Sequence, residues 1–182
     1  MPSPPPDPKP HPSVPLADIL GTHRSLTSFS SVTRMHPSSL ASDVLSQTAT
    51  ASSSTTIVLA PLNSAIDALP RKPWEDPDDY AALGQSAYDG AQGQDRANAN
   101  LRRFVDRHLV VVEAAAAGWP RGQRATSLAG RELWWDDDGS GNRFVMPDHV
   151  EVERVASRVA TGEVWMLKGV LQPATRHDST QG

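Results

Sequence analysis

Three residues, His149, Glu151 and Glu153, alternate with valines and have side chains that bind metal ions. In an extended strand they would share one face about 6.5–7 Å apart, so two of them could chelate a cation. The same alternation is typical of the solvent-facing side of a half-buried strand. Since no other histidine stands close in sequence to complete a metal site, we interpret these residues as a solvent face and predict no metal.

A second polar cluster has the spacing of the first half of a calcium-binding loop. Asp136, Asp138 and Ser140 stand at alternate positions, where such a loop places oxygen ligands. The twelfth position, however, is Pro147 instead of the bidentate glutamate. The glycines within residues 137–142 favour a hairpin turn with positive φ angles. Weak calcium binding is the alternative.

Ser140 and His149 are also the residue types of a hydrolytic nucleophile and its base. The tripeptide Gly139-Ser140-Gly141 lacks the outer glycines and the strand-to-helix context of a nucleophile elbow. The sequence has no glycine-rich phosphate loop, and no cysteine. We therefore predict a protein that is not an enzyme and has no cofactor. A hydrolase that uses Ser140 and His149 is the alternative.

The composition excludes several kinds of partner. The 182 residues include 21 acidic and 17 basic side chains, which give a formal net charge of −4. These charges are scattered, so no basic stripe is available for nucleic acid. No apolar run approaches the roughly 20 residues that span a bilayer, and the first residues lack the pattern of a signal peptide.

The chain divides into one domain between two tails. Residues 1–15 contain eight prolines, which favour an extended linker or tether, and residues 174–182 are polar. Residues 16–173 form the predicted domain, whose length suits a single hydrophobic core. Within it, a mobile loop is predicted at residues 52–55, where Ser and Thr side chains compete for backbone hydrogen bonds.

Apolar residues three or four positions apart predict the helices. One amphipathic helix is predicted over residues 16–29, and a second begins at Ser38. Asn63 is predicted to cap a short helix with its side-chain oxygen. The stretch that begins at Gly84 is rich in Gly, Gln, Ala and Asn and predicts a flexible insertion. Helix resumes by Ala97.

The strands are predicted from apolar, β-branched runs between turn residues. Thr56–Ala60 is such a run, closed by Pro61, and predicts a strand buried on both faces. The second half of the chain is punctuated by glycines, which favours short strands in antiparallel meanders. These predicted strands are Val110–Val112, Ser127–Leu128, Glu132–Trp135, Arg143–Met146, Val150–Val155 and Val164–Leu167.

His108 lies on the apolar stripe that Leu101, Phe104 and Val105 form on a predicted helix. A histidine in such a place is most often neutral and hydrogen-bonded to the backbone. We therefore predict that His108 supports the fold and does no chemistry.

Three segments, taken in order, resemble the motifs of fasciclin-like domains. They are TTIVLAPLNSAI at Thr55–Ile66, LRRFVDRHLV at Leu101–Val110 and TGEVWMLKGVLQP at Thr161–Pro173. The segment Pro70–Pro77 further looks like a fungal, single-domain branch of this family. The resemblance assigns structural roles to Leu59, Ala60, Pro61, Asn63, His108, Gly162, Leu171 and Pro173.

The resemblance implies an α+β fold, a β-rich wedge or sandwich of short antiparallel strands flanked by helices. It also implies adhesion or matrix interaction, with a protein or cell-wall component as partner and an extracellular, cell-surface or vacuolar location. Animal members bind integrins partly through a tyrosine-histidine pair. Arg107 replaces that tyrosine here, so integrin binding is not carried over. An intracellular scaffold or ligand carrier is a further alternative.

One segment has the composition of an interaction surface. It contains two prolines, which reduce the entropy lost on binding, and two aromatic residues of the kind that anchor interfaces. Its acids favour a basic partner. The candidate residues are Trp74, Glu75, Asp76, Asp78 and Tyr80. The alternative is that Trp74 packs back onto a helix of its own domain.

Overall fold

The computed structural model describes residues 14–48, 54–113 and 118–173. Three predictions therefore lie wholly or partly outside the described residues. These are the proline-rich tail as far as residue 13, the first half of the loop predicted at residues 52–55, and the polar tail at 174–182. The second half of that loop prediction is wrong, because Ser54 and Thr55 begin a strand and pair with Glu113 and Val112.

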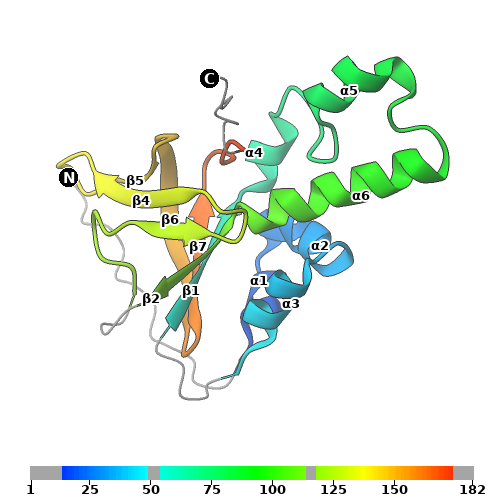
Figure 1. The fold of residues 1–182 in the computed structure, drawn as a ribbon. Helices are drawn as coiled ribbons and strands as arrows, with labels where there is room; N and C mark the ends of the chain where they lie inside the picture. Colours follow the sequence, from blue (N-terminus) through cyan, green and yellow to red (C-terminus); the bar gives the residue numbers. More distant parts are fainter. Residues whose placement is uncertain (1–13, 49–53, 114–117, 174–182) are drawn as a thin grey trace, which may run out of the picture.

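Within the described ranges, seven strands form a closed barrel in the order of the sequence (Figure 1). They are β1 (Ser54–Pro61), β2 (Leu109–Glu113), β3 (Ala125–Ser127), β4 (Glu132–Asp137), β5 (Arg143–Met146), β6 (Val150–Val159) and β7 (Gly162–Leu167). Strands β2 to β7 form the predicted antiparallel meander. Strand β1 pairs antiparallel with β2 and parallel with β7.

The parallel pairing of β1 with β7 corrects the predicted wedge or sandwich. Both strands are apolar on both faces, so an open sheet would leave two hydrophobic edges with unpaired backbone groups. Closure of the barrel pairs the backbone groups of both edges with each other. The mixed α and β content agrees with the prediction, whereas the arrangement of the strands is a barrel.

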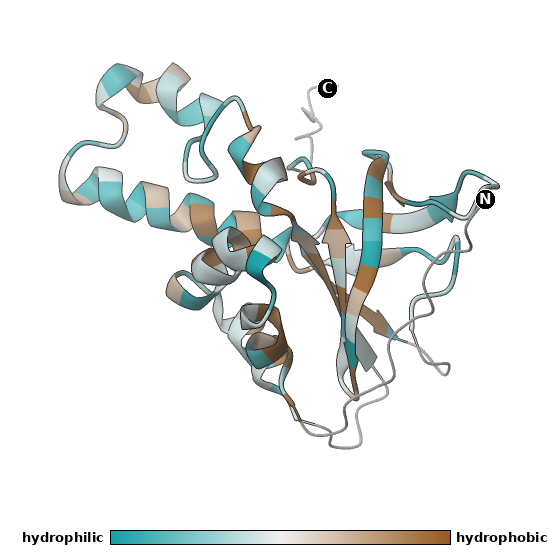
Figure 2. Ribbon diagram, turned by 180° about the vertical axis from the view of Figure 1, so that it is seen from behind, coloured by the Kyte–Doolittle hydropathy of each residue, from teal (hydrophilic) through white to brown (hydrophobic). Residues whose placement is uncertain are grey.

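Strand β1 separates two hydrophobic cores. Val58 and Ala60 pack into the core shared with the helices, while Ile57 and Leu59 pack inside the barrel. All four side chains are fully buried, which confirms the predicted strand with two buried faces. Figure 2 shows the apolar strands lying between the helices and the rest of the barrel.

Gly162 allows β7 to lie directly against β1. A Cβ atom added at this position would lie 2.0 Å from the carbonyl oxygen of Thr56, a distance that no side chain tolerates. Beside it, the Thr56 N–H donates a 2.9 Å hydrogen bond to the Thr161 carbonyl. The structural role assigned to Gly162 thus has a steric cause.

Helices cover one side of the barrel. They are α1 (Leu16–Gly21), the 3₁₀ turn η1 (Arg24–Leu26), α2 (Thr27–Met35), α3 (Ser39–Ser46), α4 (Asn63–Asp67), α5 (Pro77–Leu83), the 3₁₀ turn η2 (Gly84–Ser86) and α6 (Gly90–Asp106). Helix α3 begins as predicted, because the Ser38 hydroxyl accepts a 3.0 Å hydrogen bond from the Ala41 amide.

The single helix predicted over residues 16–29 is wrong. Helix α1 ends at Gly21, where the Thr22 amide and hydroxyl both donate to the Ile19 carbonyl. The apolar spacing was correct, since Leu26 and Phe29 are fully buried. Local hydrogen bonding breaks the helix without changing which side chains face the core.

Asn63 caps a different helix from the one predicted. It is the first residue of α4, and its side chain makes no bond to that helix. Instead, its Oδ1 accepts a 2.9 Å hydrogen bond from the Ser28 amide in the first turn of α2. Its Nδ2 donates to the Arg24 carbonyl and to the Thr27 hydroxyl. Asn63 therefore joins two helices that are distant in sequence.

Helix α6 begins at Gly90, seven residues before the predicted Ala97. The Gly- and Ala-rich stretch that predicted flexibility instead allows close packing. A Cβ atom added at Gly93 would lie 2.1 Å from the Tyr88 backbone, so the preceding loop rests directly on the helix. Together, α5 and the first half of α6 project from the barrel (Figure 1); residues 67–95 are called the arm below.

The buried place of Leu59 generates a prediction about stability. Leu59→Ala removes a core side chain inside the barrel and leaves a cavity, so the free energy of unfolding should fall by about 2–5 kcal/mol in urea denaturation. Leu40→Ala is the matched control, because Leu40 is 56% exposed and should change stability by less than about 1 kcal/mol. Equal stability of the Leu59 variant and the parent would contradict the central position of β1.

Candidate functional site

The candidate site lies on the arm, where the chain turns into α5. The Asp76 carboxylate accepts a 2.9 Å hydrogen bond from the Asp78 amide and so caps the helix. Pro77 occupies the first helical position, where its missing N–H costs nothing. Asp76, one of the predicted interaction residues, therefore positions the segment.

Tyr88 is the centre of this segment. Its hydroxyl accepts a 2.6 Å hydrogen bond from the Asp76 amide and donates one of 2.9 Å to the Asp79 carboxylate. Its ring makes edge contacts with Trp74 and Tyr80, at centroid distances of 5.0 and 5.3 Å. Burial, followed by the Asp79 hydrogen bond, raises the pKa of Tyr88.

Asn100 joins the segment to α6 by hydrogen bonds. Its amide nitrogen donates 2.9 Å hydrogen bonds to the Trp74 carbonyl and to the Asp79 carboxylate. Burial alone would raise the pKa of Asp79, but hydrogen bonds from Asn100 and Tyr88 outweigh it and lower the pKa. Asp79 is therefore held as a carboxylate within the arm.

Trp74 is half-buried against Tyr88. Its indole packs within the arm, while part of the ring still faces solvent. The sequence offered two interpretations, an exposed interface anchor and a side chain packed onto its own domain. The half-buried Trp74 agrees fully with neither. The interaction role of Trp74 stays a prediction.

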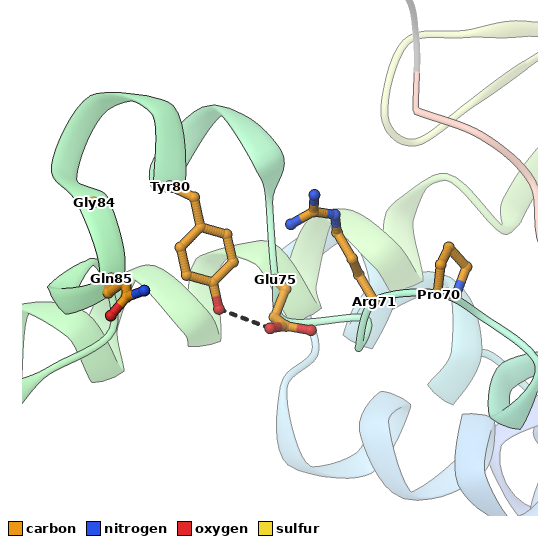
Figure 3. A pocket seen from close by; sticks show the side chains of 6 residues that line it. All are labelled: Pro70, Arg71, Glu75, Tyr80, Gly84 and Gln85. Carbon is orange, nitrogen blue, oxygen red and sulfur yellow. Dashed lines mark hydrogen bonds between the residues drawn. The ribbon is translucent and has the colours of Figure 1, made fainter.

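An open pocket with a volume of about 560 Å³ lies beside this cluster (Figure 3). The Tyr80 hydroxyl donates a 2.7 Å hydrogen bond to Glu75, whose other oxygen accepts from the Lys72 amide. The Tyr80 bond, then the amide, lower the pKa of Glu75. The pocket is lined by Pro70, Arg71, Glu75, Tyr80, Gly84 and Gln85. It therefore offers a carboxylate, a guanidinium and an amide on one accessible surface.

Sequence reasoning missed four residues of this site. Tyr88 and Asn100 organise the arm, while Arg71 and Gln85 line its pocket. A signal existed for Asn100, because it is a polar residue one position from the apolar stripe of α6 and is only 5% exposed. Arg71 and Gln85 carried no comparable signal, since both are common on surfaces.

The structure does not bring Ser140 and His149 together. Ser140 lies at the exposed tip of the β4–β5 hairpin, and His149 lies beyond the opposite end of β5. Strand β5 has four residues, which separate its ends by about 10 Å or more. The His149 ring instead stacks on Phe144 at a centroid distance of 4.2 Å. The hydrolase alternative therefore gains no support.

The acids of the hairpin make turn contacts instead of converging on a cation. The Asp138 carboxylate accepts from the Ser140 amide and from the Asn142 side chain, both at 2.8 Å. Asp136 forms a 2.6 Å ion pair with Arg121. Gly139 and Gly141 of this turn have positive φ angles, as predicted. In the described ranges, no group of three His, Asp or Glu side chains could hold a metal ion.

Glu151 and Glu153 lie on β6 and are both accessible to solvent. The Glu151 carboxylate forms a 2.6 Å ion pair with Lys168 of the segment after β7, and Glu153 is exposed.

Among the helices that the structure describes, none is long and apolar enough to cross a membrane.

His108 is fully buried where α6, β1 and the end of the domain meet. Its Nδ1 donates a 2.7 Å hydrogen bond to the Phe104 carbonyl, and its Nε2 accepts a 3.1 Å bond from the Leu171 amide. Its own carbonyl accepts from the Leu59 amide at 2.8 Å. Burial, together with the charge of Arg107, lowers the pKa of His108 to about 3. The imidazole is therefore neutral, and the structural role of His108 stays a prediction.

Arg131 and Asp148 hold the same end of the domain. Their side chains form a two-point ion pair with both distances at 2.6 Å. Arg131 also donates to the Gln172 carbonyl, while Asp148 accepts from the Gln172 amide. Burial alone would raise the pKa of Asp148, but the Arg131 pair outweighs it and lowers the pKa. The residue before Pro173 is thus fixed to two turns of the barrel.

Arg107 stands where the resemblance predicts a tyrosine. Its guanidinium lies 5.1 Å from the centre of the Phe104 ring. Its Nε is buried without a hydrogen bond to any described residue. Burial lowers the pKa of Arg107 to about 10, against the opposing effect of Asp76.

No family model matches the chain. A FAS1 domain-containing protein of Neurospora crassa is 45% identical over 159 residues, which cover 87% of this chain and 65% of that protein. Proteins of the same description from Aspergillus fumigatus and Emericella nidulans are 40% and 39% identical over 157 residues. These matches cover 86% of this chain and 62% and 61% of the relatives. The chain thus spans less than two thirds of the length of each relative.

A solved structure shares the fold. The FAS1 domain pair of the insect cell adhesion molecule Fasciclin I superposes with a TM-score of 0.54 at 10% identity, over 90% of this chain and 51% of that one. A barrel of this kind with helices on one side is therefore a fasciclin-like fold. Together with the fungal relatives, it confirms the predicted resemblance to fasciclin-like domains: the chain is similar to FAS1 domain-containing proteins of fungi.

The Tyr88 contacts generate a prediction about the arm. Tyr88→Phe leaves the Asp76 amide without a partner and removes one of the hydrogen bonds to the Asp79 carboxylate, which should lower the free energy of unfolding by about 1–3 kcal/mol. Tyr80→Phe is the control, because its hydroxyl makes a single hydrogen bond, to Glu75. Urea denaturation followed by tryptophan fluorescence measures both. Equal losses would show that Tyr88 is not the centre of the arm.

The neutral state of His108 generates a prediction about pH. In the unfolded chain the imidazole takes up a proton below pH 6.5, whereas in the folded chain it does so only near pH 3. The free energy of unfolding should therefore fall as the pH falls between these values, by up to about 1.4 kcal/mol per pH unit.

Urea denaturation at pH 7, 6 and 5 tests this dependence. His108→Gln should be less stable than the parent at pH 7 and should lose part of the pH slope. His149→Gln, at an exposed position, should keep the full slope. An unchanged slope in the His108 variant would show that other groups cause the acid sensitivity.

Proposed function

We propose that the chain is a non-enzymatic interaction module whose arm binds a basic segment of a partner protein. The observation that carries this proposal is the charge of the arm. Residues 67–95 contain seven acidic and two basic side chains, an excess of five negative charges in a chain whose net charge is −4. Such a local field favours and steers a basic partner.

The geometry of the arm supports recognition of a polypeptide. Its internal hydrogen bonds hold the backbone in one arrangement before a partner arrives, which reduces the entropy lost on binding. The half-buried Trp74 and the Tyr80–Glu75 pair place aromatic and polar surface beside the pocket. An open pocket of this kind admits side chains of a bound segment instead of enclosing a small substrate.

The similarity to FAS1 domain-containing proteins supports the wider role. The proposed partner is a protein or a cell-wall component at the extracellular, cell-surface or vacuolar location that the resemblance favours. The candidate contact residues remain Trp74, Glu75, Asp76, Asp78 and Tyr80, of which Glu75 and Asp76 also position the segment.

Binding of a lysine- and arginine-rich peptide of about 12 residues tests the proposal. The domain should bind this peptide at low salt and should not bind a glutamate-rich peptide of the same length. Neutralising three exposed acids of the arm, Asp67→Asn, Asp78→Asn and Asp89→Asn, should weaken binding by about tenfold and reduce its dependence on salt.

A second triple variant is the matched control. Asp18→Asn, Asp43→Asn and Glu153→Gln remove the same charge from exposed positions outside the arm. Equal losses for the two triple variants would show only a general charge effect and would reject the arm as the site. Binding to purified fungal walls before and after protease treatment separates the partners. Full binding to protease-treated walls would overturn a protein partner in favour of a glycan.

A further inference from the structure

A second cavity lies between α1, α2 and α3, on the helical side of the barrel and apart from the arm. Its volume is about 230 Å³. Leu20 and Leu45, which are 1% and 3% exposed, belong to its apolar lining together with Ala17 and Pro37. No acidic residue lines it. The cavity is smaller than the pockets that take drug-sized ligands.

A cation without a partner lies at this cavity. Arg34 is exposed and, within the part of the chain that the structure describes, has no hydrogen bond or ion pair. Its guanidinium reaches from α2 to the end of α1, where a Cβ atom added at Gly21 would lie 3.2 Å from its Nη2. Arg34 thus places a positive charge beside an apolar lining.

A buried hydroxyl adds a second polar group. Ser30 is 8% exposed, and its hydroxyl also makes no hydrogen bond to a described residue. Its Oγ would lie 3.8 Å from the same added Cβ atom at Gly21, so Ser30 and Arg34 both approach the end of α1. By contrast, the Thr33 hydroxyl is occupied by the Phe29 carbonyl at 2.9 Å. The Ser30 oxygen is not among the enclosed side-chain atoms that lack a partner, so it is accessible from the cavity and can donate to a ligand.

We propose that this cavity binds a medium-chain monocarboxylate, with the carboxylate at Arg34 and Ser30 and the alkyl chain against Leu20 and Leu45. Guanidinium groups bind carboxylates through paired hydrogen bonds, and Ser30 supplies a further donor. At roughly 30 Å³ for each water-sized group, the cavity holds about eight such groups. Two of these groups are the carboxylate oxygens, so this size matches a carboxylate of about six carbons.

Amide chemical shifts of the labelled domain test the site. Titration with the series from butanoate to octanoate should shift the amides of Leu20, Ser30 and Leu45. Each added methylene should tighten binding by about fourfold, the factor expected for burying one such group, until the cavity is full. Octanol, which has the same chain without the charge, should bind about tenfold more weakly than octanoate. A flat chain-length series, or equal binding of octanoate and octanol, would overturn the proposal.

Variants separate the two parts of the site. Arg34→Gln should reduce octanoate binding to the level of octanol, whereas Arg102→Gln, at an exposed position of α6, should leave it unchanged. Ala17→Leu and Ser46→Leu each fill the cavity from an exposed position and should abolish binding of both ligands without lowering the melting temperature.

Octanoate binding that survives in both filled variants would place the ligand elsewhere and reject the site. The arm variants that lose basic-peptide binding should bind octanoate like the parent. The two proposals can therefore fail independently.

Discussion

The hydrogen bonds of His108 are the interaction on which the rest of the structure depends. The ring and backbone of this one residue contact the last turn of α6, the centre of β1 and the chain after β7. Each contact uses a group that would otherwise be buried without a partner, and such a group costs about 1–3 kcal/mol. The two-point pair of Arg131 with Asp148 fixes the neighbouring residues to the same end of the barrel. Helices, barrel and C-terminal segment are therefore held in one arrangement.

Much of the fold could be predicted from the sequence, because it depends on patterns that are local. The apolar run of β1, the strands of the meander and the buried stripe of α6 follow from side-chain periodicity. The role of His108 followed from its place on that stripe. The breaks between helices could not be predicted in this way. Thr22 ends α1 with a side-chain hydrogen bond to the backbone, and such bonds compete with the hydrogen bonds of a continued helix.

The remaining features depend on contacts between distant segments. Asn63 has the sequence context of a local cap, yet Ser28 lies near enough to take its oxygen. The stretch that contains Gly93 predicted flexibility, whereas the Tyr88 backbone lies directly against this glycine, as the Thr56 backbone lies against Gly162. The candidate site was predicted only in part for the same reason. Its acidic and aromatic residues are adjacent in sequence, but Tyr88 and Asn100 reach them through the fold.

The parallel pairing of the first and last strands affects how the domain folds and unfolds. Thr56 and Gly162, which are partners in this pairing, are separated by most of the domain's sequence, so loop-closure entropy opposes their meeting. Folding should be slow for a chain of this size, with closure of the barrel as a late step. Once closed, neither strand is a free edge from which the sheet could fray. A load applied to the end of β7 would have to shear it along both of its neighbours, β1 and β6. Resistance of this kind would suit a domain that holds two surfaces together.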